Sequence, residues 1–309
     1  MHLLKSLSFL YPRLSLALLL GALGWLGANA PARAADSLKV GPAPVIVFMT
    51  DYGTLDDSVA ICKGVMLSIA PDARIIDLTH QVTAYSVADG ARFLARAAQY
   101  YPANTIFVGV VDPGVGTARR SIIARSRRGH FFVVPDNGLL TLIQDRDGID
   151  SAREITNPAW MLPGPHSATF HGRDIFSPAA AHLARGDDWA SAGPVLPQLV
   201  RMAVSSAAVD SGGINGHVVA LDGPFGNLIT DIKSDRFRLL GYQLGDKVTL
   251  KLGEKTLTVP YVSTFGDVPK GQPLLYIDSS NLVSLAVNQG NFAQSYSIVP
   301  PTTLMLPKK

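Results

Sequence analysis

Residues 106–120 read Ile-Phe-Val-Gly-Val-Val-Asp-Pro-Gly-Val-Gly-Thr-Ala-Arg-Arg, and this stretch decides the fold. Its first half is a short apolar run rich in β-branched residues, which is typical of a parallel strand buried on both faces. The chain then breaks at Asp112 into a Pro/Gly loop and turns basic at Arg119. Open α/β sheets bind ligands beyond the carboxyl ends of such strands. The segment therefore predicts a ligand site at Asp112, with an ordinary Asp-Pro-Gly turn as the alternative.

The residues before this stretch alternate between strand and helix patterns. Short apolar runs occupy residues 45–49 and 74–78, and helical periodicity follows each of them, over 59–69 and 87–100. This alternation predicts βαβ units around a parallel sheet, which gives a three-layer, Rossmann-like α/β domain.

The composition of the chain changes over residues 186–216, where Pro194, Pro197, Ser205, Ser206 and Gly212-Gly213 form a linker-like passage, and we place the domain boundary near residues 200–213. Beyond them short strand patterns recur, separated by turns with Gly, Asp and Lys, and helical patterns are few. The predicted strands are 216–221, 247–252, 256–262 and 274–277. This pattern predicts a small antiparallel β domain, a barrel or a sandwich. We therefore expect an α/β domain over 35–205 and a β-barrel domain over 214–309.

The N-terminal segment, residues 1–34, has the pattern of a secretory signal peptide. Lys5 and Arg13 precede an apolar run over residues 14–26. Two small-x-small cleavage patterns follow this run, Ala28-Asn-Ala30 and Ala32-Arg-Ala34. The run is too short and wrongly flanked for a stable membrane span. We expect cleavage near Pro31 or Ala35 and a periplasmic or secreted mature protein without a membrane partner.

Charge and cysteine content narrow the class of protein further. The whole chain has a formal net charge of +3, but residues 1–34 contain three cations and no acid, so the remainder is neutral. The basic balance belongs to the leader and does not predict nucleic-acid binding. Cys62 is the single cysteine, so no internal disulfide can form, and its apolar helical surroundings predict a buried, inert thiol.

Three carboxylates follow the first strand pattern, in the loop that leads into a helix. Asp56 or Asp57 can cap this helix, and one acid is enough for a cap. Asp51, at the end of the strand, can accept two hydrogen bonds from a sugar diol, as the acid of a Rossmann site does. Clustered carboxylates are also ligands for Mg²⁺ or Ca²⁺, so a metal site is the competing use of these residues.

A second group of polar residues stands before the helix pattern of 179–184. Phe170-His-Gly-Arg-Asp174 places His171 beside a glycine that lets a ligand approach the backbone. Arg173 and Asp174 are expected to pair with each other. Tyr85, in the loop before residue 87, can close over a ligand or simply pack.

These motifs together resemble one family, the S-adenosylmethionine hydroxide adenosyltransferases, relatives of the fluorinase and chlorinase. Five segments carry the resemblance in order, and they span nearly all of the chain after residue 34. They are Thr50-Asp-Tyr-Gly-Thr-Leu-Asp-Asp-Ser58, Asp112-Pro-Gly-Val-Gly-Thr-Ala-Arg119, Phe170-His-Gly-Arg-Asp174, Asp222-Gly-Pro-Phe-Gly-Asn227, and Asp278-Ser-Ser280 before Asn288-Gln-Gly290.

The resemblance implies a homotrimer with sites between subunits, S-adenosylmethionine or adenosine as ligand, and neither metal nor other cofactor. It implies that Asp51 binds the ribose hydroxyls and that Asp56, Ser58 and Asp222 bind the methionine end, and Tyr85 is expected among the substrate-binding residues. Ser279 and Ser280 match residues near the methionine carboxylate, and Phe225, Asn227 and Phe265 match the adenine pocket. Asp112, Arg119 and His171 match three residues that act on water.

The chemistry of a sulfonium fits those three residue types. Methionine leaves without protonation, so catalysis depends on placing one water in line with the ribose 5′ carbon. Asp112 can accept a proton from this water, and Arg119 is expected to keep the acid ionised. His171 can hold the water or share its proton.

Two other functions remain to be weighed. The halogenating relatives carry Tyr where this chain has Asp112, and an anionic carboxylate repels a halide. A non-catalytic periplasmic nucleoside-binding protein on the same fold is the second alternative, and we expect it to lack one of Asp112, Arg119 and His171. All three are present, which favours hydrolysis of S-adenosylmethionine to adenosine and methionine.

Overall fold

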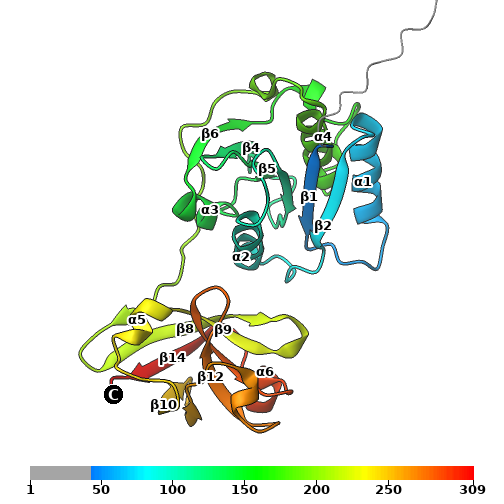
Figure 1. Ribbon diagram of the computed structural model, residues 1–309. Helices are drawn as coiled ribbons and strands as arrows, with labels where there is room; N and C mark the ends of the chain where they lie inside the picture. The colour runs from blue at the N-terminus through cyan, green and yellow to red at the C-terminus, as the bar shows by residue number, and fades with distance from the viewer. Residues whose placement is uncertain (1–42) are drawn as a thin grey trace, which may run out of the picture. The chain divides into compact units, whose positions relative to one another are not determined.

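The structure is a computed structural model, which describes residues 43–309 (Figure 1). The expected signal peptide and its cleavage sites lie outside these residues. Within 43–309, no helix is both long and apolar enough to cross a membrane.

The first part of the chain forms a six-stranded sheet in the order β2-β1-β3-β5-β4-β6. β2, β1, β3 and β5 run parallel, and β4 is antiparallel to both of its neighbours. β3 lies in the interior of the sheet and all its residues are buried, as its continuous apolar sequence predicts. The strands are β1 (Val45–Thr50), β2 (Arg74–Thr79), β3 (Ile106–Val110), β4 (Ser121–Ser126), β5 (Phe131–Pro135) and β6 (Ile149–Glu154).

Helices cover both faces of this sheet, which completes the three-layer α/β arrangement (Figure 1). Alternate residues of β1 point to opposite faces, so Phe48 packs with α1 and α4 while Met49 packs with α2 and α3. Cys62 of α1 is fully buried in the first of these cores, as predicted. The helices are α1 (Ser58–Ile69), α2 (Val87–Ala98), α3 (Thr141–Arg146) and α4 (Ser177–Arg185).

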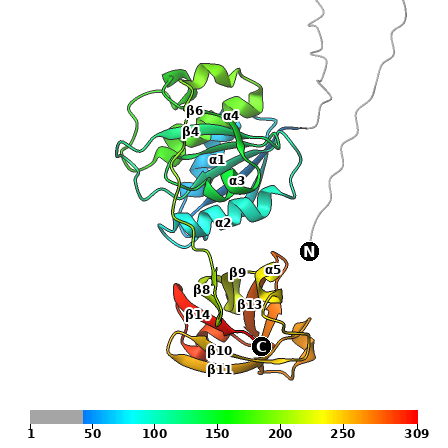
Figure 2. The ribbon, with the colours of Figure 1, turned by 90° about the vertical axis from the view of Figure 1, so that its left-hand side faces the viewer.

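The C-terminal part forms an eight-stranded sheet whose order is β11-β10-β14-β8-β9-β13-β12, with β7 paired to β8. A bridge between Tyr261 and Leu275 joins the two ends of this order, so the sheet nearly closes into a barrel (Figure 2). The strands are β7 (Ala208–Val209), β8 (Gly213–Asp222), β9 (Asn227–Lys233), β10 (Lys247–Leu252), β11 (Lys255–Pro260), β12 (Pro273–Ile277), β13 (Leu282–Val287) and β14 (Thr302–Pro307).

Inward-facing residues of the barrel strands form its core, which alternation along β10 illustrates. Val248, Leu250 and Leu252 are buried, while Lys247, Thr249 and Lys251 between them are exposed. Two short helices also contribute core residues, Phe237 from α5 (Ser234–Arg238) and Phe292 from α6 (Phe292–Tyr296).

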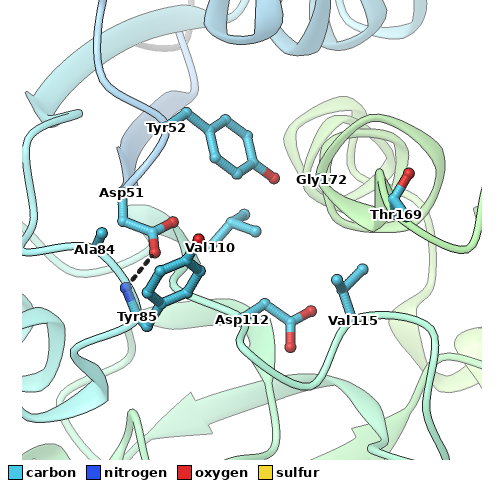
Figure 3. A pocket seen from close by; sticks show the side chains of 9 residues that line it. All are labelled: Asp51, Tyr52, Ala84, Tyr85, Val110, Asp112, Val115, Thr169 and Gly172. Atoms are coloured by element: carbon cyan, nitrogen blue, oxygen red, sulfur yellow. Dashed lines mark hydrogen bonds between the residues drawn. The ribbon is translucent and has the colours of Figure 1, made fainter.

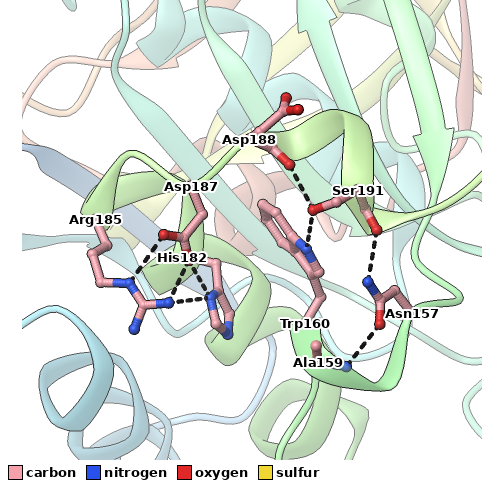
Figure 4. Close-up of polar contacts among 8 residues, drawn as sticks. All are labelled: Asn157, Ala159, Trp160, His182, Arg185, Asp187, Asp188 and Ser191. Carbon is pink, nitrogen blue, oxygen red and sulfur yellow. Dashed lines mark hydrogen bonds and ion pairs between the residues drawn. The ribbon is translucent and has the colours of Figure 1, made fainter.

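Polar contacts fix the end of α4 and the segment that follows it (Figure 4). His182 Nδ1 lies 2.6 Å from Asp187 Oδ2, and Arg185 also pairs with Asp187. Gly186 adopts the left-handed conformation that ends the helix between these partners. The Trp160 indole donates to Ser191 Oγ at 3.0 Å. These contacts anchor α4, whose amino end is part of the site described next.

Candidate active site

Two carboxylates lie just beyond the carboxyl ends of neighbouring parallel strands. Thr50 and Val110, the last residues of β1 and β3, are register partners. Asp51 follows Thr50 directly, and Asp112 comes two residues after Val110. The two acids therefore share the sheet edge where open α/β folds bind ligands, as the sequence predicts.

A cavity of about 260 Å³ opens between these loops (Figure 3). Three of the predicted site residues line it, namely Asp51, Tyr85 and Asp112. Asp51 Oδ2 accepts a hydrogen bond from the Tyr85 backbone N–H at 2.9 Å, which fixes the loop before α2 against the end of β1. The remaining lining residues are Tyr52, Ala84, Val110, Val115, Thr169 and Gly172.

Arg119 joins the other two predicted catalytic residues. Its Nη2 donates to Asp112 Oδ2 at 2.5 Å and lies 3.0 Å from His171 Nδ1. Its Nη1 donates to Ser121 Oγ at 2.7 Å. The guanidinium lies over the Phe176 ring, 5.4 Å from its centroid. Arg119 is thus held from several sides, and it brings together two segments that are far apart in the sequence.

His171 stands directly before a π-helical turn, η2 (Gly172–Phe176), which continues into α4. Such turns occur often at functional sites. In the same turn Arg173 Nε donates to Asp174 Oδ1 at 2.6 Å, so these two residues pair with each other, as expected from the sequence.

Burial governs the ionisation of this group. The side chains of Arg119 and Asp112 are only 7% and 5% exposed. Burial raises the pKa of Asp112 above its ordinary value, although the charge of Arg119 opposes the rise. Desolvation is thus the larger influence on this pKa, and Arg119 acts in the direction expected from the sequence, towards the ionised acid. Burial, and then Arg119, lowers the pKa of His171 and favours the neutral imidazole.

Asp112 also presents an unused acceptor to this region. Its Oδ1 is buried and has no hydrogen-bond partner among residues 43–309. A buried carboxylate oxygen without a partner is costly, and such an atom calls for an explanation such as a catalytic role or a bound water.

The other two acids of the first loop do not face this cavity. Asp57 occupies the cap position of α1 but makes no cap hydrogen bond, whereas Asp56 Oδ1 accepts from the Ser58 backbone N–H at 3.0 Å. The cap contact therefore comes from the residue before the cap position. Asp56 is exposed and Ser58 half-buried, and their contact with the methionine end stays a prediction. No cluster of three His, Cys, Asp or Glu suited to a metal ion occurs within 43–309.

The predicted binding residues of the barrel occupy three of its loops. Asp222 closes β8 and is the register partner of Asn227, which opens β9 and is buried. Between them, in η4 (Gly223–Phe225), Phe225 is 64% exposed. Ser279 and Ser280 lie in the turn between β12 and β13, where the Ser280 N–H donates to Asp278 Oδ1 at 2.8 Å.

Tyr276, in β12, contacts one of these loops, and the sequence analysis did not single it out. Its ring packs against Phe265 of η5 (Phe265–Asp267), with 5.0 Å between the centroids. Burial, and then the charges of Asp222 and Asp278, raises the pKa of Tyr276 to about 12. The place of Tyr276 in a predicted strand gave no signal of this contact. The contacts of Asp222, Phe225, Asn227, Phe265, Ser279 and Ser280 with a ligand stay predictions.

Comparison with known proteins decides the family. The model of the SAM hydroxide adenosyltransferase N-terminal domain matches residues 46–193, and that of the C-terminal domain matches residues 216–304. The chain belongs to the SAM hydroxide adenosyltransferase family. The loops that line the cavity described above all lie within the N-terminal match.

Relatives in this family match this chain over almost their whole length. The (R)-S-adenosyl-L-methionine hydrolase of Salinispora arenicola is 41% identical over 260 residues, which are 83% of this chain and 95% of the relative. The fluorinase of an Actinoplanes species is 33% identical over 293 residues, 86% of this chain and 98% of the relative. The crystal structure of an uncharacterized conserved protein from Thermotoga maritima matches with a TM-score of 0.81 at 35% identity, covering 85% of this chain and 99% of that one.

Proposed function

We propose that the protein hydrolyses S-adenosyl-L-methionine to adenosine and L-methionine. The observation that carries this proposal is the buried, unpartnered Oδ1 of Asp112 at the cavity, on a carboxylate whose other oxygen is held by Arg119. Such an oxygen is placed to accept a proton from a single water. Relatives named as hydrolases of this substrate support the assignment.

The reaction is an in-line displacement at the ribose 5′ carbon. The water oxygen forms a bond to this carbon while the bond to sulfur breaks, and its electron pair stays on sulfur, which becomes the neutral thioether of methionine. One water proton passes to Asp112 Oδ1 and then to solvent. Because the leaving group departs uncharged, the protein's task is to orient the water and accept its proton.

The contact with Arg119 fixes what His171 can do. A guanidinium only donates hydrogen bonds, so His171 Nδ1 must accept from Arg119 Nη2. The neutral imidazole then carries its hydrogen on Nε2. His171 therefore donates a hydrogen bond to the water oxygen, and Asp112 is the base. Asp51 holds the ribose hydroxyls, since it directly follows β1 and lines the same cavity as Asp112.

The decisive experiment incubates purified protein with S-adenosylmethionine in water labelled with heavy oxygen. We expect labelled adenosine and unlabelled methionine, and inversion at a 5′ carbon made chiral with deuterium. Ligand binding without turnover would instead indicate a nucleoside-binding protein. A chlorinated nucleoside formed from added chloride would indicate a halide-using transferase, as the names of the fluorinase relatives suggest for those proteins.

Export and assembly are further parts of the proposal. We propose that residues 1–34 are removed on export, so that the protein acts in the periplasm or outside the cell, and that it assembles as a homotrimer. N-terminal sequencing of the protein from its own cells tests the first, with Ala35 as the expected start. Light scattering of the mature protein tests the second.

A further inference from the structure

The hydroxyl of Tyr52 is a polar group in the cavity that the mechanism above does not use. Tyr52 lines the cavity together with Asp51 and Asp112, and its side chain points toward the turn that carries Gly172 (Figure 3). Within residues 43–309 no group forms a hydrogen bond with this hydroxyl. An ordered hydroxyl without a protein partner in a cavity is available to a ligand or a water.

The ring of Tyr52 is held in place, so its hydroxyl has a defined position. The Tyr52 backbone N–H donates to Thr50 Oγ1 at 3.2 Å, at the end of β1. Its ring packs edge-on against Phe170, with 5.9 Å between centroids and 70° between planes. Phe170 directly precedes His171. The two segments that position Tyr52 are therefore those that carry Asp51 and His171.

Gly172 gives the hydroxyl room to reach this position. A Cβ on Gly172 would overlap Tyr52 Oη and would lie 3.2 Å from the ring carbon that bears it. The absence of a side chain at this buried residue thus allows the phenol to approach the backbone next to His171. Burial, and then the charges of Cys62, Asp51 and Asp112, raises the pKa of Tyr52 well above the ordinary value for tyrosine, so the phenol is neutral at physiological pH.

In the proposed reaction, one hydrogen of the attacking water has no acceptor yet, and a neutral phenol could fill this position. Water has two lone pairs and two hydrogens. One lone pair attacks the 5′ carbon, and the other accepts from His171 Nε2. One hydrogen goes to Asp112 Oδ1, and the second needs an acceptor if the water is to be fully oriented. A neutral phenol oxygen can accept it.

We propose that Tyr52 Oη accepts the second hydrogen of the nucleophilic water and so acts as a fourth catalytic residue beside Asp112, Arg119 and His171. This inference rests on the proposed hydrolysis. It assigns Tyr52 to the reacting water and not to the substrate, so its loss affects the chemical step and leaves binding intact.

The first test is Tyr52→Phe, which keeps the ring and its packing on Phe170. A neutral hydrogen bond made to the reacting water corresponds to a decrease in kcat of roughly tenfold. We expect this decrease with unchanged KM, unchanged adenosine affinity and unchanged melting temperature. Tyr100→Phe, the same change at an exposed site at the end of α2, is the matched control and should leave kcat unchanged. An unchanged kcat in Tyr52→Phe, or a rise in KM alone, would overturn the inference.

The second test is a double-mutant cycle with Gly172→Ala. The added methyl displaces the Tyr52 hydroxyl, so Gly172→Ala should lower kcat in the wild-type background. In Tyr52→Phe the overlapping oxygen is absent, and the same methyl should cost much less. The two changes are therefore expected to be less than additive. Fully additive losses in kcat would show that Gly172 does not act through the Tyr52 hydroxyl.

The wild-type protein separates this inference from the proposed function. If it releases no adenosine from S-adenosylmethionine, the proposed hydrolysis is wrong and the role of Tyr52 falls with it. If it releases adenosine and Tyr52→Phe is as fast, only the role of Tyr52 is wrong.

Discussion

Arg119 Nη2 lies 3.0 Å from Nδ1 of His171, and this contact makes the protonation state of the imidazole part of the site. A proton on Nδ1 would face the guanidinium and replace a hydrogen bond with repulsion between two cations. Protonated His171 therefore cannot keep its place beside Arg119. The arrangement seen in the structure belongs to the neutral imidazole.

We expect this to appear in the pH dependence of kcat/KM. Activity requires neutral His171 and ionised Asp112, and both conditions fail as the pH falls. The pKa of His171 is lowered from 6.5, first by burial and then by Arg119, and burial raises the pKa of Asp112 from 3.8. The acid limb should therefore lie above 3.8, the ordinary pKa of the carboxyl, because Asp112 must be ionised. Rate measurements from pH 3 to pH 9 test this. Full activity below pH 3.8 would contradict it.

Replacing Asp112 by Asn should remove the base and keep the shape of the side chain. We expect Asp112→Asn to lower kcat by about 10²–10⁴-fold, the usual contribution of positioned acid–base help. Adenosine affinity should hold, because Asp112 is assigned to the water. Asp145→Asn is the control, since Asp145 also pairs with an arginine, Arg201, but is exposed and lies outside the cavity. Equal losses in the two variants would show that the effect is unspecific.

Asp51→Ala should weaken substrate binding. Loss of a charged hydrogen-bond partner costs about 1.5–3 kcal/mol, which is roughly ten- to over a hundredfold in affinity. Asp51 also accepts from the Tyr85 N–H, so part of the loss can come from the loop. Asp51→Asn retains an acceptor for that N–H and separates the two causes. Calorimetry with adenosine measures both variants, and unchanged affinity in folded Asp51→Ala would refute the assignment.

The loop after Asp112 is fixed against the segment before His171 by a glycine. Gly116 has a φ of +76°, and a Cβ there would overlap the backbone oxygen of Ala168. We expect Gly116→Ala to lower the melting temperature and also kcat, because the methyl separates the two catalytic segments. Gly164→Ala is the matched control, since Gly164 has a φ of +105° but no atom near its missing Cβ. A kcat loss of the same size in Gly164→Ala would argue against the contact.

The sequence was informative where local pattern determines structure. The buried run 106–111 predicted β3, and strands followed by acidic loops placed Asp51 and Asp112 at one sheet edge. In the barrel, the two-residue strand β7 was missed, and so were β9, β13 and β14. β9 begins within the motif that ends at Asn227, and β14 follows Pro300 and Pro301, so turn signals obscured both. β13 has one polar residue, Ser284, and lacks the polar alternation of a half-exposed strand, because it is almost wholly buried.

The properties of the site that depend on distant contacts could not be predicted. Arg119 and His171 are 52 residues apart, and only the fold shows that they touch. The desolvation that raises the pKa of Asp112 likewise comes from packing in three dimensions. Tyr52 lies inside one of the family motifs, but the sequence does not show that its hydroxyl lies beside Gly172, which is the contact that suggests its proposed role.

The pairing of Thr50 with Val110 also sets the spacing between the ends of β1 and β3. Adjacent strands are held about 4.8 Å apart by their hydrogen bonds, so the interval between the side chains that extend them is set by the sheet and not by flexible loops. If Asp51 binds the sugar diol and Asp112 acts at the 5′ carbon, the spacing of β1 and β3 matches the distance between these two parts of a ribose. The site then selects compounds by their sugar, whatever their leaving group. A compound that differs only in having its diol moved by one carbon should not bind.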